Sequence, residues 1–228
     1  MKKGDTRREQ ILLTAESLFY VKGFEQTSVQ DILDVLHFSK GGFYHHFDCK
    51  LTLLEEICSM RAEESFEAAQ EAVYGMQDDP VASLNAMLDS GSMFRADHLD
   101  YVGLLLRVAY REDGALMREK LKQRTLELML PLMNDIIERG VQEGLFLMPH
   151  PSLAGELVLR LSAQFTDEVA RVLSREDAEP EQMAEIIAKL ELYRHTVERM
   201  LNAPFGSIVL YDMKNLAAVC RGLSAKKA

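Results

Sequence analysis

The sequence contains no tryptophan, only six prolines among its 228 residues, and three cysteines. With so few prolines and only 13 glycines, it lacks the turn punctuation that many short strands require, which favours long helices. An odd, small number of cysteines does not form a disulfide framework and fits the reducing cytoplasm. Hydrophobic residues still make up 47% of the chain, enough to fill a substantial core. The composition therefore excludes disordered, collagen-like and low-complexity classes.

The chain also lacks the apolar segments that secretion or membrane insertion requires. Its first ten residues, MKKGDTRREQ, are charged, unlike a signal peptide. Even the apolar stretch 102–110 is shorter than the roughly 18 residues of a membrane span and contains Arg107. We therefore expect a cytoplasmic protein with no membrane partner.

The net charge of −10 is unevenly distributed along the chain. Residues 1–50 carry seven basic and seven acidic side chains, so the whole acidic excess lies in residues 51–228. Because salt screens electric fields over about 8–10 Å, a local patch in the first 50 residues can still attract phosphate. The acidic remainder argues against nonspecific adhesion to nucleic acid.

Helical periodicity and capping signals organise the N-terminal part. Gly23 ends a first apolar stripe, and both Thr27–Gln30 and Ser28–Asp31 have the spacing of a capping box for a second helix. Ser39 is the expected N-cap of a very short third helix. Three such helices joined by short turns predict a helix-turn-helix. The expected helices cover 7–22, 28–36, 39–45 and 49–74.

The rest of the chain shows helical periods without strand alternation, so we expect an all-α protein. An N-terminal three-helix DNA-binding domain would cover 1–48, extending to about 66 through the fourth helix. A larger helical domain would cover 49–228. Pro131 should bend or break its helix. The expected helices cover 80–91, 99–111, 115–143, 151–175, 180–202 and 208–222.

The stretch 39–47 is the most informative for function. Two glycines in a short helix cost roughly 1 kcal/mol each against alanine, which is unusual unless another surface must come close. Phe43 and Phe47 fit the small core. The exposed N–H groups of the first turn can meet phosphate. Hydrogen-bond donors around that turn come from Ser39, Lys40, Tyr44, His45 and Lys50.

Other chemistries find little support in the sequence. The group His45, His46, Asp48 and Cys49 could suggest a metal, but adjacent histidines on a helix diverge by about 100° and the i,i+4 pair is absent. Cys49 could be a redox sensor, although an ordinary small side chain is the simpler interpretation. The sequence shows no nucleophile pattern or phosphate-cradling glycine loop. We therefore expect no metal, no cofactor and no enzymatic activity.

The order and spacing of the motifs resemble the DNA-binding domain of the TetR (TetR/AcrR-like) family of bacterial transcriptional regulators. The resemblance covers about residues 6–66 and rests on Phe19, 22–29, Ile32, 39–47, Lys50 and 53–54. It implies DNA contacts by the start of the second helix, the third helix and the start of the fourth. The corresponding residues are Thr27, Ser28, Lys40, Gly41, Gly42, Tyr44, His45 and Lys50.

Three positions depart from the family pattern. His37 replaces the glycine that is common in the turn, so we expect a left-handed backbone there. Cys49 replaces the usual serine N-cap and Leu51 the usual glutamate. The last two changes should weaken the cap of the fourth helix, with Asp48 as a candidate replacement.

Methionines and aromatic residues are frequent between residues 60 and 148. Most fit an ordinary helical core, but methionine also adapts to irregular apolar cavities. The resemblance implies a small-molecule effector pocket among these middle helices, where Arg107 and Arg124 could orient a polar group. The candidate pocket residues are Met60, Phe66, Met87, Met93, Phe94, Tyr101, Arg107, Tyr110, Arg124, Met129 and Phe165.

Two late apolar stripes are candidates for a dimer interface. On the 180–202 helix the stripe has the 4-3-4-3 spacing that suits a partner helix. Both stripes could instead be buried within one subunit. The resemblance implies that two helices from each subunit form a four-helix interface. The candidate residues are Leu157, Leu161, Phe165, Ile186, Leu190, Tyr193, Val197 and Met200.

Together these features predict a homodimeric DNA-binding transcriptional regulator. The expected mechanism is repression at a pseudo-palindromic operator, relieved by a small apolar molecule. The alternative is a helical interaction module that has kept the fold but does not bind an operator. The sequence does not identify the effector or the operator.

Overall fold

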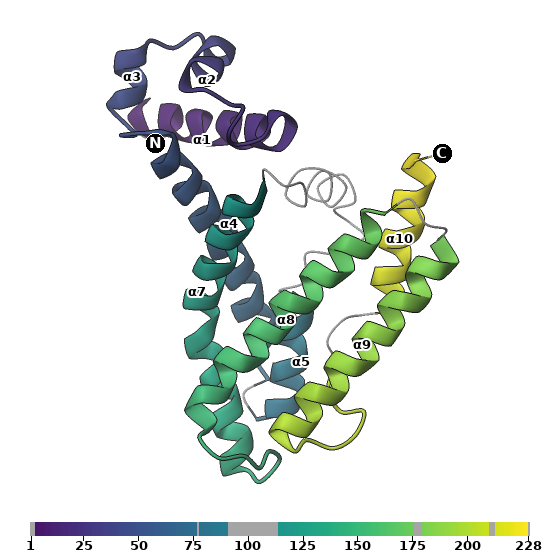
Figure 1. Cartoon of the computed structure of the whole chain (residues 1–228). Coiled ribbons are helices and arrows are strands. Elements are labelled where there is room, and N and C mark those ends of the chain that lie inside the picture. Colours follow the sequence, from purple (N-terminus) through teal and green to yellow (C-terminus); the bar gives the residue numbers. More distant parts are fainter. Residues whose placement is uncertain (1–2, 77, 91–113, 176–178, 210–212, 228) are drawn as a thin grey trace. The chain divides into compact units, whose positions relative to one another are not determined.

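The computed structural model describes residues 3–76, 78–90, 114–175, 179–209 and 213–227 (Figure 1). Every regular element in these ranges is a helix, and the predicted all-α fold is confirmed. By their internal contacts the residues form one unit of 1–62 and 104–124 and a second unit of 63–103 and 125–228. The helices are α1 (Lys3–Lys22), α2 (Val29–Leu36), α3 (Lys40–Tyr44), α4 (Lys50–Val73), α5 (Pro80–Ser90), α7 (Ala115–Gln142), α8 (Pro151–Leu173), α9 (Glu179–Leu201) and α10 (Met213–Lys227).

The first unit is built on the apolar stripe predicted for α1. Ile11 and Phe19 are almost completely buried, as are Ile32 of α2 and Ile57 of α4. α2 packs on α1, and α3 packs on α2 (Figure 1). Phe43 has no exposed surface and fixes the short α3 to this core. The small core therefore determines how α3 is presented.

Two residues with positive φ connect these helices. Gly23 ends α1 with a φ of 93°, and its N–H donates to Phe19 O. His37 follows α2 in the left-handed region, with φ 55° and ψ 39°, as the sequence predicted. The backbone N–H groups of His37 and Phe38 both donate to Leu33 O, which satisfies the end of α2. Histidine tolerates this conformation better than bulkier or β-branched side chains do.

Within the second unit, α8 and α9 pack against each other, and α10 packs on α9 (Figure 1). α7 runs through Pro131, so the expected break at this residue is wrong. Pro131 lies on the exposed side of α7, whereas Met129 and Met133 beside it are buried. Burial of those neighbours offsets the backbone hydrogen bond that proline cannot donate.

Other predicted boundaries shift by a few residues. α1 begins at Lys3, four residues before the expected start. α10 begins at Met213 rather than at 208, because Ser207, Ile208 and Val209 form an extended connection. The helix expected at 99–111 lies outside the described residues. Among the helices of the described ranges, none combines the length and apolar character needed to cross a bilayer.

The start of α2 is stabilised by a complete capping box. Ser28 Oγ accepts from the N–H of Asp31 at 3.1 Å, and the N–H of Ser28 donates to Asp31 Oδ2 at 2.7 Å. Lys22 Nζ lies 2.8 Å from Asp31 Oδ1. The hydrogen bonds from Lys22 and Ser28 hold the pKa of Asp31 far below its usual range.

Replacing Asp31 with asparagine should therefore reduce stability in a pH-dependent way. Because the folded-state pKa is depressed, the carboxylate stabilises the fold above the unfolded pKa, about 3.9, and loses this effect as pH falls below it. We expect Asp31→Asn to be less stable than wild type at pH 7, with the difference shrinking toward pH 2. Urea unfolding across this range measures it, with the exposed Asp48→Asn as control. An equal difference at every pH would contradict the assignment.

Candidate nucleic-acid interface

Thr27 and Ser28 have different roles at the start of α2. Thr27 is 1% exposed, and its hydroxyl donates to Gly23 O at 2.7 Å, so it fixes the α1–α2 turn. Ser28 is exposed, and its hydroxyl caps α2 through Asp31. Of the two residues expected to face DNA, the structure places only the side chain of Ser28 on the surface. The buried position of Thr27 hydroxyl is not compatible with a direct contact.

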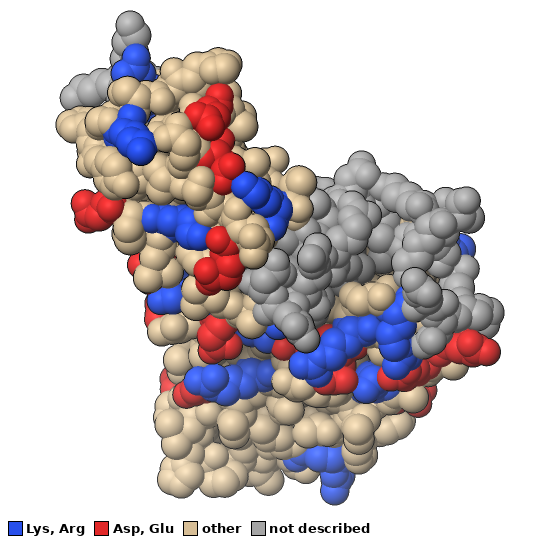
Figure 2. All heavy atoms as spheres, turned by 45° about the horizontal axis from the view of Figure 1, so that its top comes forward, with Lys and Arg blue, Asp and Glu red and all other residues tan. Residues whose placement is uncertain are grey.

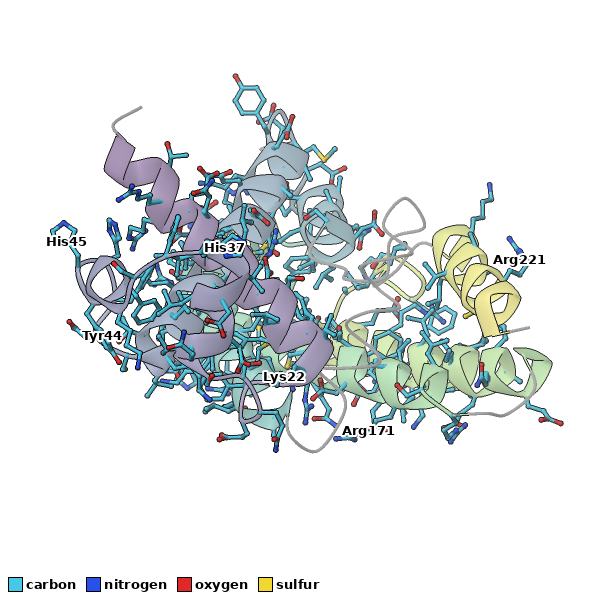
Figure 3. All side chains as sticks on the ribbon, turned by 90° about the horizontal axis from the view of Figure 1, so that it is seen from above. Lys22, His37, Tyr44, His45, Arg171 and Arg221 are labelled. Atoms are coloured by element: carbon cyan, nitrogen blue, oxygen red, sulfur yellow. The ribbon has the colours of Figure 1, made fainter. Side chains whose placement is uncertain are left out.

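The exposed face of α3 carries most of the other expected contact residues. Ser39 Oγ accepts from the N–H of Gly42 at 3.3 Å and is the N-cap, as predicted. Lys40 and His45 are exposed, and Tyr44 is 55% exposed. Seen from above, Tyr44 and His45 lie at the outer edge of the unit and point away from α1 (Figure 3). The core side of α3 therefore holds the helix in place while this face stays free.

Glycines 41 and 42 have no structural reason inside the described protein. A Cβ at Gly41 would meet no atom within 4 Å, and one at Gly42 would meet only Ser39 Oγ at an ordinary 3.5 Å. By contrast, a Cβ at Gly140 would lie 2.2 Å from Phe146 and one at Gly155 2.1 Å from Asn134. Packing requires glycine at those two positions but not in α3. The bare surface of the first turn of α3 leaves room for another molecule.

The cap of α4 uses sulfur in place of oxygen. Cys49 Sγ lies 3.3 Å from Thr52 Oγ1, three residues into the helix. Hydrogen bonds from the side chain and backbone of Thr52 lower the pKa of the exposed Cys49 thiol. The substitution of serine by cysteine therefore retains a capping contact. A redox role for Cys49 stays a hypothesis.

Lys50 does not extend freely from the start of α4. Its Nζ donates to Phe24 O at 2.6 Å and to Glu25 O at 3.4 Å, and lies 4.2 Å from the centre of the Phe24 ring. The sequence predicted a phosphate contact for this residue. The structure instead places it against the α1–α2 turn.

The surface of this unit carries charges of both signs. Acidic and basic side chains are interspersed on the face shown in Figure 2. Beside α3 lies a hollow of about 150 Å³ lined by Arg7, Phe38, Ser39 and Gly42, with two histidines, His37 and His46. Arg7 also lies over the Phe38 ring at 5.6 Å. No described residue that lines this hollow is acidic.

The geometry above matches known regulators. Residues 11–57 match the family described as bacterial regulatory proteins, tetR family. A solved TetR-family transcriptional regulator from Pectobacterium atrosepticum superposes with a TM-score of 0.60 and 20% identity, covering 90% of this chain and 100% of that one. The chain belongs to the tetR family. Its N-terminal helices are the helix-turn-helix of this family.

Curated relatives match mainly over the N-terminal part of this TetR-family chain. A helix-turn-helix regulator from the lacX 3′ region of Lactococcus lactis is 35% identical over 86 residues, or 36% of this chain and 42% of the relative. The transcriptional repressor KstR2 of Rhodococcus jostii is 34% identical over 82 residues, or 36% of this chain and 40% of the relative. The chain thus spans about two fifths of the length of these two relatives.

The candidate effector residues of the TetR-family chain fall into separate groups. Met87, Met129 and Phe165 are buried in the second unit. Met60 and Phe66 are half-buried on α4. Arg124 belongs to the first unit, where its Nε donates to Ser59 Oγ at 3.1 Å. The remaining candidates lie outside the described residues: Met93, Phe94, Tyr101, Arg107 and Tyr110.

The candidate dimer residues are divided by the packing of α8 on α9. Phe165, Ile186 and Val197 are buried within the protomer, and Leu190 is only 9% exposed. The Phe165 ring packs against Tyr193 with centroids 5.2 Å apart. These side chains are therefore closed off inside one subunit. Leu161 and Met200 are half-buried, and Leu157 is exposed.

The exposed leucines of this region form a different set from the predicted seam. Leu153 is 66% and Leu157 53% exposed, one turn apart on α8. Leu192 on α9 is 64% exposed and was missed, because it lies outside the 4-3-4-3 spacing. A leucine on the otherwise charged face of α9 was the signal that could have revealed it.

Proposed function

We propose that this protein is a transcriptional regulator that binds duplex DNA through α3 and the start of α2. The observation that carries the proposal is the bare first turn of α3, where Gly41 and Gly42 serve no internal packing. Lys40, Tyr44 and His45 are exposed around it and can donate hydrogen bonds to phosphate or bases. The names of the helix-turn-helix relatives support the same function.

Repression is the mode of control that the relatives support best. The R. jostii relative is named a transcriptional repressor. We extend the proposal to a homodimer whose two α3 helices read a pseudo-palindromic operator. The exposed Leu153 and Leu157 on α8 support an interface on this face, because adjacent exposed leucines gain stability when a second copy covers them.

Gly42→Ala should separate folding from DNA binding. Alanine in place of glycine should stabilise the helix by up to about 1 kcal/mol, because the added methyl group has room. The same methyl group would obstruct close approach of the duplex, so we expect affinity to fall at least tenfold. Melting temperature and fluorescence anisotropy, with a duplex that wild type selects from a random pool, measure the two effects.

Gly155→Ala is the matched control for the melting experiment, because its Cβ would clash with Asn134 and lower stability. Unchanged duplex affinity of Gly42→Ala would contradict the placement of α3 against DNA. A wild-type protein that selects no duplex would favour the alternative, a helical interaction module without operator binding.

Glutamate at Leu153 and Leu157 should dissociate the dimer without unfolding the subunit. Both side chains are exposed in the protomer, so the charge is costly only when a partner covers it. Sedimentation velocity should show dimers for wild type and monomers for the double variant. Leu147→Glu, at a 72% exposed position outside α8, is the control and should stay dimeric. A dimeric double variant would exclude this face from the interface.

A small apolar molecule that binds within the second unit is the proposed effector. The buried Met87, Met129 and Met133 support this, because methionine side chains rearrange readily around apolar ligands. An effector must bind the DNA-free state more tightly, and a difference of about 1–3 kcal/mol changes operator affinity about 5–150-fold. It should raise the melting temperature and release the selected duplex in the anisotropy assay. A screen of apolar compounds in which none does both would contradict this part.

A further inference from the structure

Lys50 joins two segments that are distant in sequence. It is the first residue of α4, and its Nζ donates to the carbonyl of Phe24, 26 residues earlier, at 2.6 Å. A longer contact of 3.4 Å reaches Glu25 O. The ammonium group also lies 4.2 Å from the centre of the Phe24 ring, within the range of a cation–π interaction. Three contacts thus hold one side chain on the α1–α2 turn.

The acceptor side of this contact is firmly held. Phe24 is 8% exposed and packs edge-to-face on Phe19, with ring centroids 5.2 Å apart. Phe24 O also accepts the N–H of Thr27, one residue before the N-cap of α2. The carbonyl that Lys50 binds is therefore part of the turn that aims α2.

The position of Lys50 in its own helix is otherwise unfavourable. A cation in the first turn meets the positive end of the helix dipole, and the first turn of α4 contains no acidic residue to compensate. The carbonyls and the ring of Phe24 supply the compensating negative potential. A lysine here is thus favourable only while α4 stays against the α1–α2 turn.

We propose that Lys50 is a positioning residue that sets the angle of α4 to the DNA-reading helices, and that it is not a phosphate contact. The proposal rests on the proposed function. α4 has 24 residues and leaves the first unit after Ala62. At 1.5 Å per residue the helix is about 36 Å long, so a tilt of about 5° at its start moves its far end by about 3 Å. In a dimer this tilt changes the separation of the two α3 helices, which must match half-sites about 34 Å apart.

The test compares two lysines on the duplex that wild type selects from a random pool, used whole and cut to one half-site. Lys50→Gln should weaken whole-duplex binding at least tenfold while half-site binding changes less than twofold. The slope of log affinity against log salt should stay unchanged, because no phosphate contact is lost. Lys50→Arg should restore whole-duplex affinity, since a guanidinium can bind both carbonyls and stack on Phe24.

Lys40→Gln is the matched control, because Lys40 is exposed on α3. It should weaken both duplexes alike and reduce the salt slope by about 0.9. If Lys50→Gln gives this same pattern, or if Lys50→Arg fails to restore binding, the positioning role is overturned. If wild type selects no duplex, the proposed function fails and the role of Lys50 fails with it.

A second variant guards against loss of folding, which circular dichroism reports. Phe24→Leu keeps Lys50 and both carbonyls and removes only the ring that the ammonium group faces. It should lower whole-duplex affinity in the same direction as Lys50→Gln, at an unchanged salt slope. Whole-duplex binding at the wild-type level in a folded Phe24→Leu and a folded Lys50→Gln would overturn the proposal.

Discussion

A buried ion pair between Glu16 and Arg61 holds the DNA-reading helices to the rest of their unit. Glu16 on α1 is 5% exposed, and Arg61 on α4 donates to both of its carboxylate oxygens, through Nε at 2.7 Å and Nη2 at 2.6 Å. Removing one partner of such a pair typically costs about 3–5 kcal/mol, because the other charge stays buried. α1 therefore cannot leave α4 cheaply, and α2 and α3 pack in turn on α1 and α2.

The opposite contacts of α4 are made with the start of α7. Glu55 pairs with Lys120 at 2.7 Å, and the thiol of Cys58 lies 3.7 Å from Met117 O. Burial raises the pKa of Cys58 to about 11, which keeps this thiol protonated and unreactive. α4 thus shares contacts with the reading helices and with α7. Both α4 and α7 continue into the second unit, so they are the covalent routes by which a ligand bound there can influence DNA binding.

Much of the candidate interface was predictable because its signals are local. Ser39 lies at the N-cap of α3 and His37 in a left-handed turn, as capping rules and the missing glycine indicated. Two errors have one cause. Thr27 and Ser28 both had capping-box spacing, but only Ser28 caps α2, because the Thr27 hydroxyl finds a buried acceptor in Gly23. Lys50 likewise finds carbonyl acceptors that no neighbour in sequence could reveal.

The sequence by itself determined the helices of the described ranges, because apolar periodicity, N-caps and stop glycines act between residues within about one turn. It also determined membership of the tetR family through motifs in residues 11–57. Only the tertiary structure decided which side chains remain free for a partner. The contact between Phe165 and Tyr193 closes the predicted α9 seam inside one subunit. Which apolar faces meet depends on packing between distant segments, and periodicity alone does not specify the partner of a buried face.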